Sequence, residues 1–284
     1  MKSTLKARAP FEQALISHIE KKTNIRQSTR ISFYSISPPL IPEKPFDIKV
    51  AKKGGYFNFP PTGSMYLCAS IDALKLNNVD CRVIDLNNSL LKHANLDIDF
   101  TYDSWKRDIN AKSDSSKLLV FLVSYMFGTT KECYINTARH IRLSYPDALI
   151  ITGGVQASFD KDEILESDLV DIASLYEGEL QIQYIAKILS SLVNKNNSKQ
   201  ESFFSEDETI PGGLCFKTNA ETIDSGPPTR PVSFDWDLSK FYQQISINDY
   251  NKYGGLGPFT NYIYSYTGEK LKYATVLSKR GCRA

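Results

Sequence analysis

Small and hydroxyl-bearing residues follow several stretches of this chain that have the character of buried strands. Glycine lets the backbone approach a ligand closely, and serine or threonine adds a hydrogen-bonding group of little bulk. Loops that follow parallel strands meet at one edge of a sheet, where large ligands bind. We therefore expect a binding site there, formed by Ser124, Thr129, Thr130, Gly153, Gly154, Glu177 and Gly178.

Each of these groups also has a purely structural interpretation. Gly153-Gly154 could simply end a strand, and Ser124 with Thr129-Thr130 could cap the helix that follows. Glu177 and Glu179 would suit the first turn of a helix, where the helix dipole favours negative charge. The sequence leaves both interpretations open, and it identifies no catalytic residue.

Cysteine and histidine offer a different chemistry, because their thiolate and imidazole groups bind metals. None of the three histidines has a second His, Cys or carboxylate at ligand spacing, so we expect structural or solvated roles for them. The five cysteines are scattered and odd in number, which argues against a disulfide framework and favours the reducing cytoplasm. Cys282 stands apart, because it follows Arg280 and Gly281 directly after a predicted strand over residues 272–277.

The elements that would position the candidate residues alternate between strand and helix. Residues 117–124 are almost entirely apolar, as expected for a central strand buried on both faces of a parallel sheet. Alternation of this kind predicts an α/β fold with a doubly wound, Rossmann-like, mostly parallel five-stranded sheet. The five strands are predicted over residues 31–36, 80–86, 117–124, 148–152 and 169–173.

The chain divides into four regions on this interpretation. Residues 1–29 are expected to form a helical leader, and residues 30–193 form the Rossmann-like domain. Residues 194–271 form a polar linker and connector that contains a small hairpin, and residues 272–284 form the start of a further domain.

Composition excludes some classes of function. The 284 residues are 42% hydrophobic and 23% charged, as in ordinary globular proteins. No apolar run is long enough to cross a membrane. The formal net charge of +2 comes without a concentrated basic stretch, so we expect no nucleic-acid partner.

Taken in order, the motifs of this chain resemble the N-terminal part of radical S-adenosylmethionine (SAM) proteins with a cobalamin (B12)-binding domain. The resemblance covers about residues 31–284. It rests on Pro38-Pro39, Pro60 to Leu67, Val83 to Leu86, Ser124 to Thr130, Gly153 to Ser158, Tyr176 to Glu179, Pro211 to Leu214, Phe234 to Trp236 and Arg280 to Cys282.

The resemblance implies that a corrin ring lies over the strand ends. Ser124, Thr129-Thr130 and Gly153-Gly154 would line the corrin and its nucleotide tail, and Glu177-Gly178 would lie at the last strand end. Many B12 domains carry a D-x-H-x-x-G loop whose histidine ligates cobalt. Here the loop over residues 37–42 has no histidine, so cobalamin would bind base-off without a His ligand.

The resemblance also implies that Cys282 is the first of three cysteines that hold a [4Fe–4S] cluster at the start of a radical SAM barrel. The second and third cysteines would fall beyond Ala284, so this chain alone would not cleave SAM. The complete protein would cleave SAM to a 5′-deoxyadenosyl radical. It would then transfer a methyl group from methylcobalamin to an unknown small-molecule or peptide substrate.

Two alternative functions remain open at this stage. A doubly wound domain with Gly153-Gly154 would also suit a nucleotide-sugar-binding transferase. The second alternative is a non-catalytic corrinoid carrier or sensor. A purified chain that retains a corrinoid would favour the cobalamin-binding domain or the carrier and sensor over the nucleotide-sugar-binding transferase.

Overall fold

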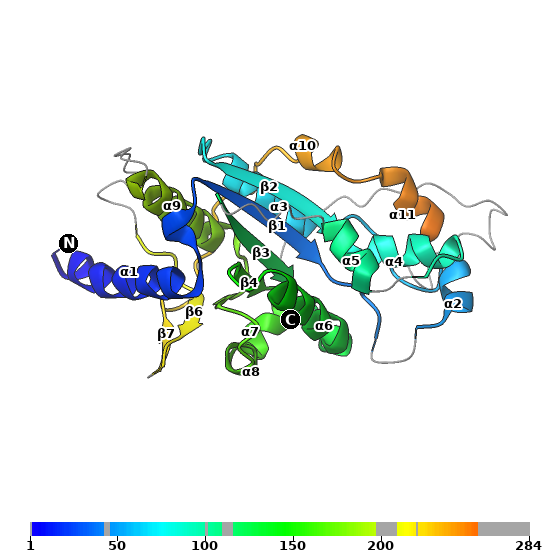
Figure 1. Cartoon of the computed structure of the whole chain (residues 1–284), viewed down its shortest axis with the longest axis horizontal. Helices are drawn as coiled ribbons and strands as arrows, with labels where there is room; N and C mark the ends of the chain where they lie inside the picture. The colour runs from blue at the N-terminus through cyan, green and yellow to red at the C-terminus, as the bar shows by residue number, and fades with distance from the viewer. Residues whose placement is uncertain are drawn as a thin grey trace.

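A computed structural model describes residues 2–42, 46–99, 102–109, 116–196, 209–219 and 221–254 of the chain. The expected strand over residues 272–277 and the motif Arg280 to Cys282 lie outside the described residues. Within those residues, one sheet of seven strands has the order β2-β1-β3-β4-β5-β6-β7 (Figure 1). The strands are β1 (Arg30–Ser37), β2 (Val79–Asp85), β3 (Lys117–Ser124), β4 (Leu149–Gly153), β5 (Ile172–Ser174), β6 (Leu214–Lys217) and β7 (Thr222–Asp224).

The strands β1 to β5 are parallel, which confirms the predicted α/β fold with a mostly parallel sheet. Their order reverses between β1 and β3, so that the loops after these two strands flank a switch point. The predicted number of five strands is wrong for the sheet as a whole. The expected hairpin, β6 and β7, pairs antiparallel with β5 through Ile172 and Phe216 and so extends the same sheet.

Helices cover both faces of the sheet, as a doubly wound fold requires. The helices α3 (Thr62–Asp72) and α9 (Glu179–Asn196) pack on one face, here called the α3/α9 face. The helices α6 (Lys131–Ser144) and α8 (Lys161–Glu166) pack on the other, the α6/α8 face. Alternate residues of β3 enter the two cores: Val120 and Leu122 face α3 and α9, whereas Phe121 and Val123 face α6 and α8. This double burial is the reason why β3 is apolar almost throughout.

The N-terminal helix α1 (Lys2–Lys22) lies against the hairpin and α9 (Figure 1). The ring centroids of Phe11 and Phe216 are 5.7 Å apart, and the Tyr184 hydroxyl donates to Glu12 at 3.0 Å. Helix α1 thus lies within the region 1–29 that was expected to be a helical leader.

Several short helices complete the fold, among them one that the sequence does not predict. The sequence of residues 86–95 is typical of a polar loop, but these residues form the helix α4. The Asp85 carboxylate caps this helix by accepting a hydrogen bond from Asn88 N at 3.0 Å. The apolar side chains Leu86, Leu90 and Leu91 of α4 are buried. The other short helices are η1 (Ile25–Gln27), α2 (Ile48–Lys52), α5 (Tyr102–Ile109), η2 (Gly128–Thr130), α7 (Val155–Phe159), α10 (Ser239–Tyr242) and α11 (Ile247–Tyr253).

The segment with α10 and α11 runs along β2, the edge strand of the sheet (Figure 1). The Gln244 side chain accepts from Val83 N at 2.9 Å and donates to the Cys81 carbonyl at 3.4 Å. The Tyr250 hydroxyl donates to the Asp85 carboxylate at 2.8 Å. The connector is therefore attached to the sheet edge by side-chain hydrogen bonds.

Candidate functional site

The carboxyl ends of β1, β3, β4 and β5 carry a row of small residues on the α3/α9 face. Strand register places Ser124 beside Gly153 and Gly153 beside Ser174. The register of β1 and β3 pairs Ile36 with Val123, so Ser37 and Ser124 follow next on the two strands. We call Ser37, Ser124, Gly153 and Ser174 the small-residue row. The small side chains of this row let neighbouring helices approach the sheet edge closely.

The helices α3 and α9 begin over this row. Ser37 Oγ lies 3.3 Å from Ser64 Oγ in the first turn of α3. A Cβ atom on Gly178, directly before α9, would lie 3.1 Å from Ser174 Oγ and 3.4 Å from Leu67 Cδ2. Glycine at position 178 thus lets α9 start close to the row, which gives this predicted residue a packing role.

Two buried hydroxyl groups lie on this part of the sheet. Ser174 is 2% exposed and Ser35, two residues before Ser37 on the same face, is 1% exposed. Neither Oγ atom has a hydrogen-bond partner among the described residues. A buried hydroxyl without a partner costs free energy, which a ligand with polar atoms could recover.

Sequence reasoning overlooked Ser35, Ser37 and Ser174. Apart from Ser124 at the end of β3, the candidate residues all came from the segments that follow the predicted strands. Counting back by two residues from each strand end would have identified the side chains that share one face.

Gly153 and Gly154 bring the ends of β3, β4 and β5 close together. Gly154 has a φ of +113°, and a Cβ atom there would lie 2.6 Å from the Tyr125 carbonyl oxygen. A Cβ atom on Gly153 would lie 3.1 Å from the Ser174 carbonyl oxygen. Both glycines are thus needed for the close approach of neighbouring backbone segments.

The two threonines after β3 have different positions. Thr130 is buried and its hydroxyl donates to the Phe127 carbonyl at 2.9 Å, which is the role of a helix-start residue. Thr129 is exposed on the same turn. The structural interpretation therefore accounts for Thr130, whereas Ser124 belongs to the small-residue row.

Glu177 and Glu179 at the end of β5 also differ. Glu177 forms an ion pair with Arg230 at 3.5 Å, which connects this loop to the extended segment after the hairpin. Glu179 is 2% exposed and begins α9. The preceding residue Tyr176 adopts a left-handed conformation with a φ of +61° and is exposed.

Exposed apolar side chains follow the ends of β3, β4 and β5, next to the small-residue row. Hydrogen bonds join these three loops: Gln156 N donates to the Tyr125 carbonyl at 3.2 Å, and Tyr176 N donates to Ser158 Oγ at 2.9 Å. Large exposed apolar groups on neighbouring loops are typical of a binding surface. We call them the apolar rim, formed by Met126, Phe127, Val155, Phe159 and Tyr176.

The Asp85 carboxyl at the end of β2 has a shifted pKa. Burial raises its pKa to about 6, although Asn88 N and the Tyr250 hydroxyl both donate to the carboxylate. The partly buried charge is therefore stabilised only incompletely by neutral donors.

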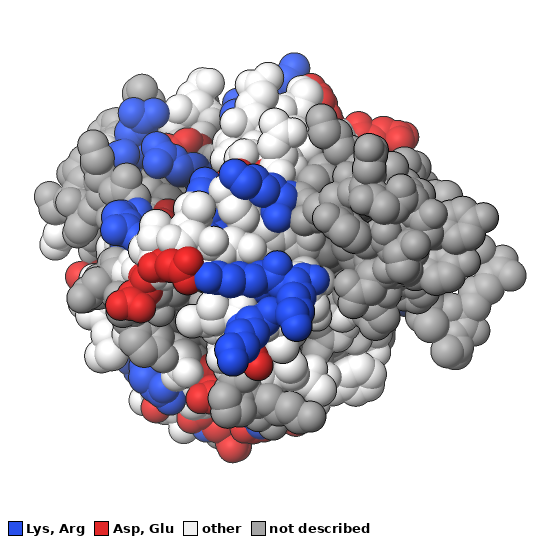
Figure 2. Space-filling model, turned by 90° about the vertical axis from the view of Figure 1, so that its right-hand side faces the viewer, with Lys and Arg blue, Asp and Glu red and all other residues white. Residues whose placement is uncertain are grey.

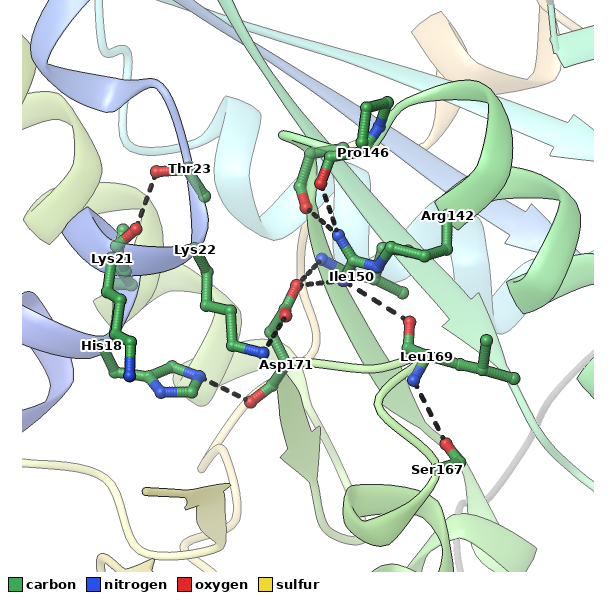
Figure 3. A network of polar contacts seen from close by, with 12 residues as sticks. His18, Lys21, Lys22, Thr23, Arg142, Pro146, Ile150, Ser167, Leu169 and Asp171 are labelled. Atoms are coloured by element: carbon green, nitrogen blue, oxygen red, sulfur yellow. Dashed lines mark hydrogen bonds and ion pairs between the residues drawn. The ribbon is translucent and has the colours of Figure 1, made fainter. Parts of the chain in front are cut away.

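The opposite, amino edge of the sheet holds a polar network around Asp171, directly before β5 (Figure 3). The fully buried Asp171 carboxylate accepts from Arg142 Nη2 at 2.7 Å and from Ile150 N at 2.8 Å. His18 Nε2 lies 3.0 Å from the Asp171 carbonyl, and burial lowers the pKa of His18. His18 thus has the structural role predicted for it and lies away from the candidate site.

The described residues include no group of three or more His, Cys, Asp or Glu side chains that could hold a metal ion. Cys282, the predicted cluster ligand, lies outside them. None of the helices that the structure describes is long and apolar enough to cross a membrane.

Charges are mixed on the side of the molecule that carries α2, α4 and α11. Figure 2 shows basic side chains gathered near the middle of this face, with acidic side chains around them. Some of the charges on these helices are paired, as between Lys52 and Asp97 and between Lys92 and Asp249.

No family model and no curated protein matches this sequence. Similar solved structures include the radical SAM methyltransferase TsrM from Kitasatospora setae with cobalamin and a [4Fe–4S] cluster bound, at 14% identity and a TM-score of 0.46. That likeness covers 72% of this chain and 30% of TsrM. The cobalamin-dependent SAM radical enzyme OxsB with aqua-cobalamin bound is similar at 14% identity and a TM-score of 0.45, over 70% of this chain and 22% of OxsB.

A second structure of TsrM, with tryptophan substrate and a SAM analogue bound, is similar at 16% identity and a TM-score of 0.42. That likeness covers 71% of this chain and 31% of TsrM. This chain therefore spans less than a third of the length of each of these enzymes.

Proposed function

We propose that this chain is the cobalamin-binding domain of a B12-dependent radical SAM enzyme of the methyltransferase type. The proposal rests on one observation: the small-residue row and the apolar rim lie at the same carboxyl edge of a doubly wound sheet. A corrinoid has a broad ring and a polar nucleotide tail, so it needs both a wide apolar surface and a narrow polar slot.

The residues present fit such a ligand. The row from Ser37 to Ser174 would admit the tail between the sheet and the first turns of α3 and α9. The buried hydroxyls of Ser35 and Ser174 would donate to polar atoms of the tail. The apolar rim would contact one face of the ring, and a ring of this size covers several such side chains.

The predicted site residues have distinct roles in this proposal. Ser124 and Gly153-Gly154 would line the tail, and Gly178 would admit it beneath α9. Thr129 would lie at the exposed margin, whereas Thr130 would shape the loop rather than touch the ligand. Glu177 would fix the β5 loop through Arg230.

The loop after β1 contains no histidine that could ligate the cobalt of a bound corrinoid. Pro38 and Pro39 are buried, and Leu40 N donates to the Asn87 side chain at 2.8 Å, so this loop is fixed by the protein. Base-off binding without His ligation is therefore part of the proposal. When bound, the corrinoid would supply a transferable methyl group, whereas SAM and the cluster at Cys282 would belong to the complete protein.

The proposal is tested by incubating the chain with hydroxocobalamin, removing free ligand by gel filtration and recording the visible spectrum. We expect a corrin band that co-elutes with the protein and has the shape of a base-off corrinoid. Absence of that band from the folded protein would overturn the proposal. Stabilisation of the chain by a nucleotide sugar instead would favour a transferase.

A matched pair of variants locates the ligand in the slot. Ser174→Leu fills the row and should abolish retention of the corrinoid. Ser174→Ala removes only the hydroxyl and should weaken binding by about ten-fold or less, the effect of one lost hydrogen bond. Thermal unfolding of both variants shows that each remains folded. Equal binding by wild type and Ser174→Leu would place the ligand elsewhere.

A further inference from the structure

Tyr125, directly after β3, connects the loops that carry most of the apolar rim. Its hydroxyl donates to Asp160 Oδ2 at 3.0 Å. The same carboxylate accepts from Gln156 Nε2 at 3.1 Å through each of its oxygens. Asp160 lies between α7 and α8, so one carboxylate joins the end of β3 to both turns that follow β4.

Backbone contacts bring the same two loops together. The Tyr125 carbonyl accepts from Gln156 N at 3.2 Å and from Ala157 N at 3.3 Å, and Gly154 gives it room. A Cβ atom on Gly128 would lie 3.3 Å from Gln156 Oε1, so the Gln156 side chain also packs against the loop after β3. The relative position of the two loops therefore depends on Tyr125, Gln156 and Asp160 together.

Packing and a hydrogen bond together hold the Tyr125 ring, which is 1% exposed. The ring stacks on Tyr134 with centroids 4.2 Å apart, but a hollow of about 30 Å³ lies beside both rings. Asp160 and the ion pair between Lys131 and Glu163 form part of the wall of this hollow. The hydrogen bond to Asp160 fixes the hydroxyl end of this ring beside the hollow, where stacking on Tyr134 alone leaves the hydroxyl group without a partner.

We propose that Tyr125 and Asp160 are positioning residues for the ligand of the carboxyl edge. They hold Met126 and Phe127 on one loop and Val155 and Phe159 on α7 at a fixed spacing. This inference rests on the proposed function, since the ligand that the rim contacts is the corrinoid. A ligand that spans both loops binds most tightly when their spacing is set before it arrives.

The experiment compares Tyr125→Phe and Asp160→Asn with the matched control Glu163→Gln. The control makes the same carboxylate-to-amide change nearby, on the exposed ion pair beside the hollow. Titration with hydroxocobalamin should give an affinity about ten-fold lower for the first two variants and unchanged for the control, because a hydrogen bond to a charged group is lost. The circular dichroism of the bound corrin should also change, since it reports the orientation of the ring.

The double variant separates a shared role from two independent ones. If Tyr125 and Asp160 act through their mutual hydrogen bond, Tyr125→Phe with Asp160→Asn should weaken binding little more than either single change. Two independent effects that multiply would contradict the proposal, as would single variants that bind and orient the corrinoid like the wild type.

Amide hydrogen exchange in the free protein gives a second test that needs no ligand. Tyr125→Phe should speed exchange in residues 126–130 and 154–159 and leave β3 and β4 protected. Unchanged exchange would overturn the positioning role even if the wild type binds cobalamin. A wild type that binds no corrinoid would overturn the proposed function, whereas faster exchange in the variant would still support the coupling of the loops.

Discussion

The two edges of the sheet bury different kinds of polar group, although each holds buried atoms without a described hydrogen-bond partner, among them Asp171 Oδ1 at the amino edge. At the amino edge, the Asp171 carboxylate has Arg142 at 2.7 Å and Lys22 at 3.9 Å, so its charge is surrounded by cations (Figure 3). At the carboxyl edge, the Asp85 carboxylate accepts from neutral donors only in the contacts described for it, and the hydroxyls of Ser35 and Ser174 have no described partner.

The difference lies in the kind of polar group that each edge buries, which is a charged pair at the amino edge and neutral hydroxyls with a carboxylate bound by neutral donors at the carboxyl edge. An edge closed by a charged network resists change, because removing one member leaves another charge buried. A buried hydroxyl without a described partner can gain a hydrogen bond from a bound ligand. The predictions below test each side of this comparison.

The largest effect is expected at the amino edge, from Arg142→Met. The variant leaves the buried Asp171 charge without its closest cation, so the free energy of unfolding should fall by about 3–5 kcal/mol. Chemical denaturation measures the change. The double variant Arg142→Met with Asp171→Leu should recover part of the loss, because it removes the unpaired charge. If Arg142→Met has the same free energy of unfolding as the wild type, the ion pair with Asp171 does not stabilise this edge.

A smaller loss is expected at the carboxyl edge, from Gly154→Ala. The Cβ atom would come too close to the Tyr125 carbonyl, and a left-handed alanine is strained, so we expect a loss of about 2–3 kcal/mol. Gly226→Ala is the matched control, since Gly226 has a φ of +97° and nothing within 4 Å of its Cβ position. The control should cost only about 1 kcal/mol. Equal losses in the two variants would mean that loop contact at Gly154 is unimportant.

The smallest effect concerns pH and Asp85. Folding raises the pKa of this carboxyl to about 6, so the folded state binds its proton more tightly than the unfolded chain does. Its contribution to stability is therefore present below about pH 4 and lost as pH rises through 6, by about 1–3 kcal/mol. Asp85→Asn should remove this component, so the difference in stability between wild type and variant should change over that pH range. If the difference in stability between wild type and Asp85→Asn stays constant over this pH range, folding does not raise the pKa of Asp85.

Much of the fold could be predicted from the sequence, because strand patterning is local. The apolar run of β3 and the alternation with helices follow directly from periodicity and burial. The glycines at positions 153 and 154 also indicated close backbone approach. The seven-stranded sheet could not be predicted, since pairing of β6 with β5 depends on contacts between distant residues.

The site was only partly predictable for a similar reason. Ser124 and Gly153 were recognised at strand ends, but their alignment with Ser37 and Ser174 requires the register of four strands. The helix α4 was missed because Asn87 and Asn88 resemble loop residues. The cap from Asp85 and the burial of its leucines override that local preference.

The side chain of Gln244 has a consequence for the behaviour of the protein in concentrated solution. An uncovered edge strand presents free amide and carbonyl groups to which another chain can add, which leads to aggregation. By engaging Val83 N and the Cys81 carbonyl, Gln244 occupies the positions that an intruding strand would use on β2. The connector thereby keeps the sheet from growing at this edge into intermolecular assemblies.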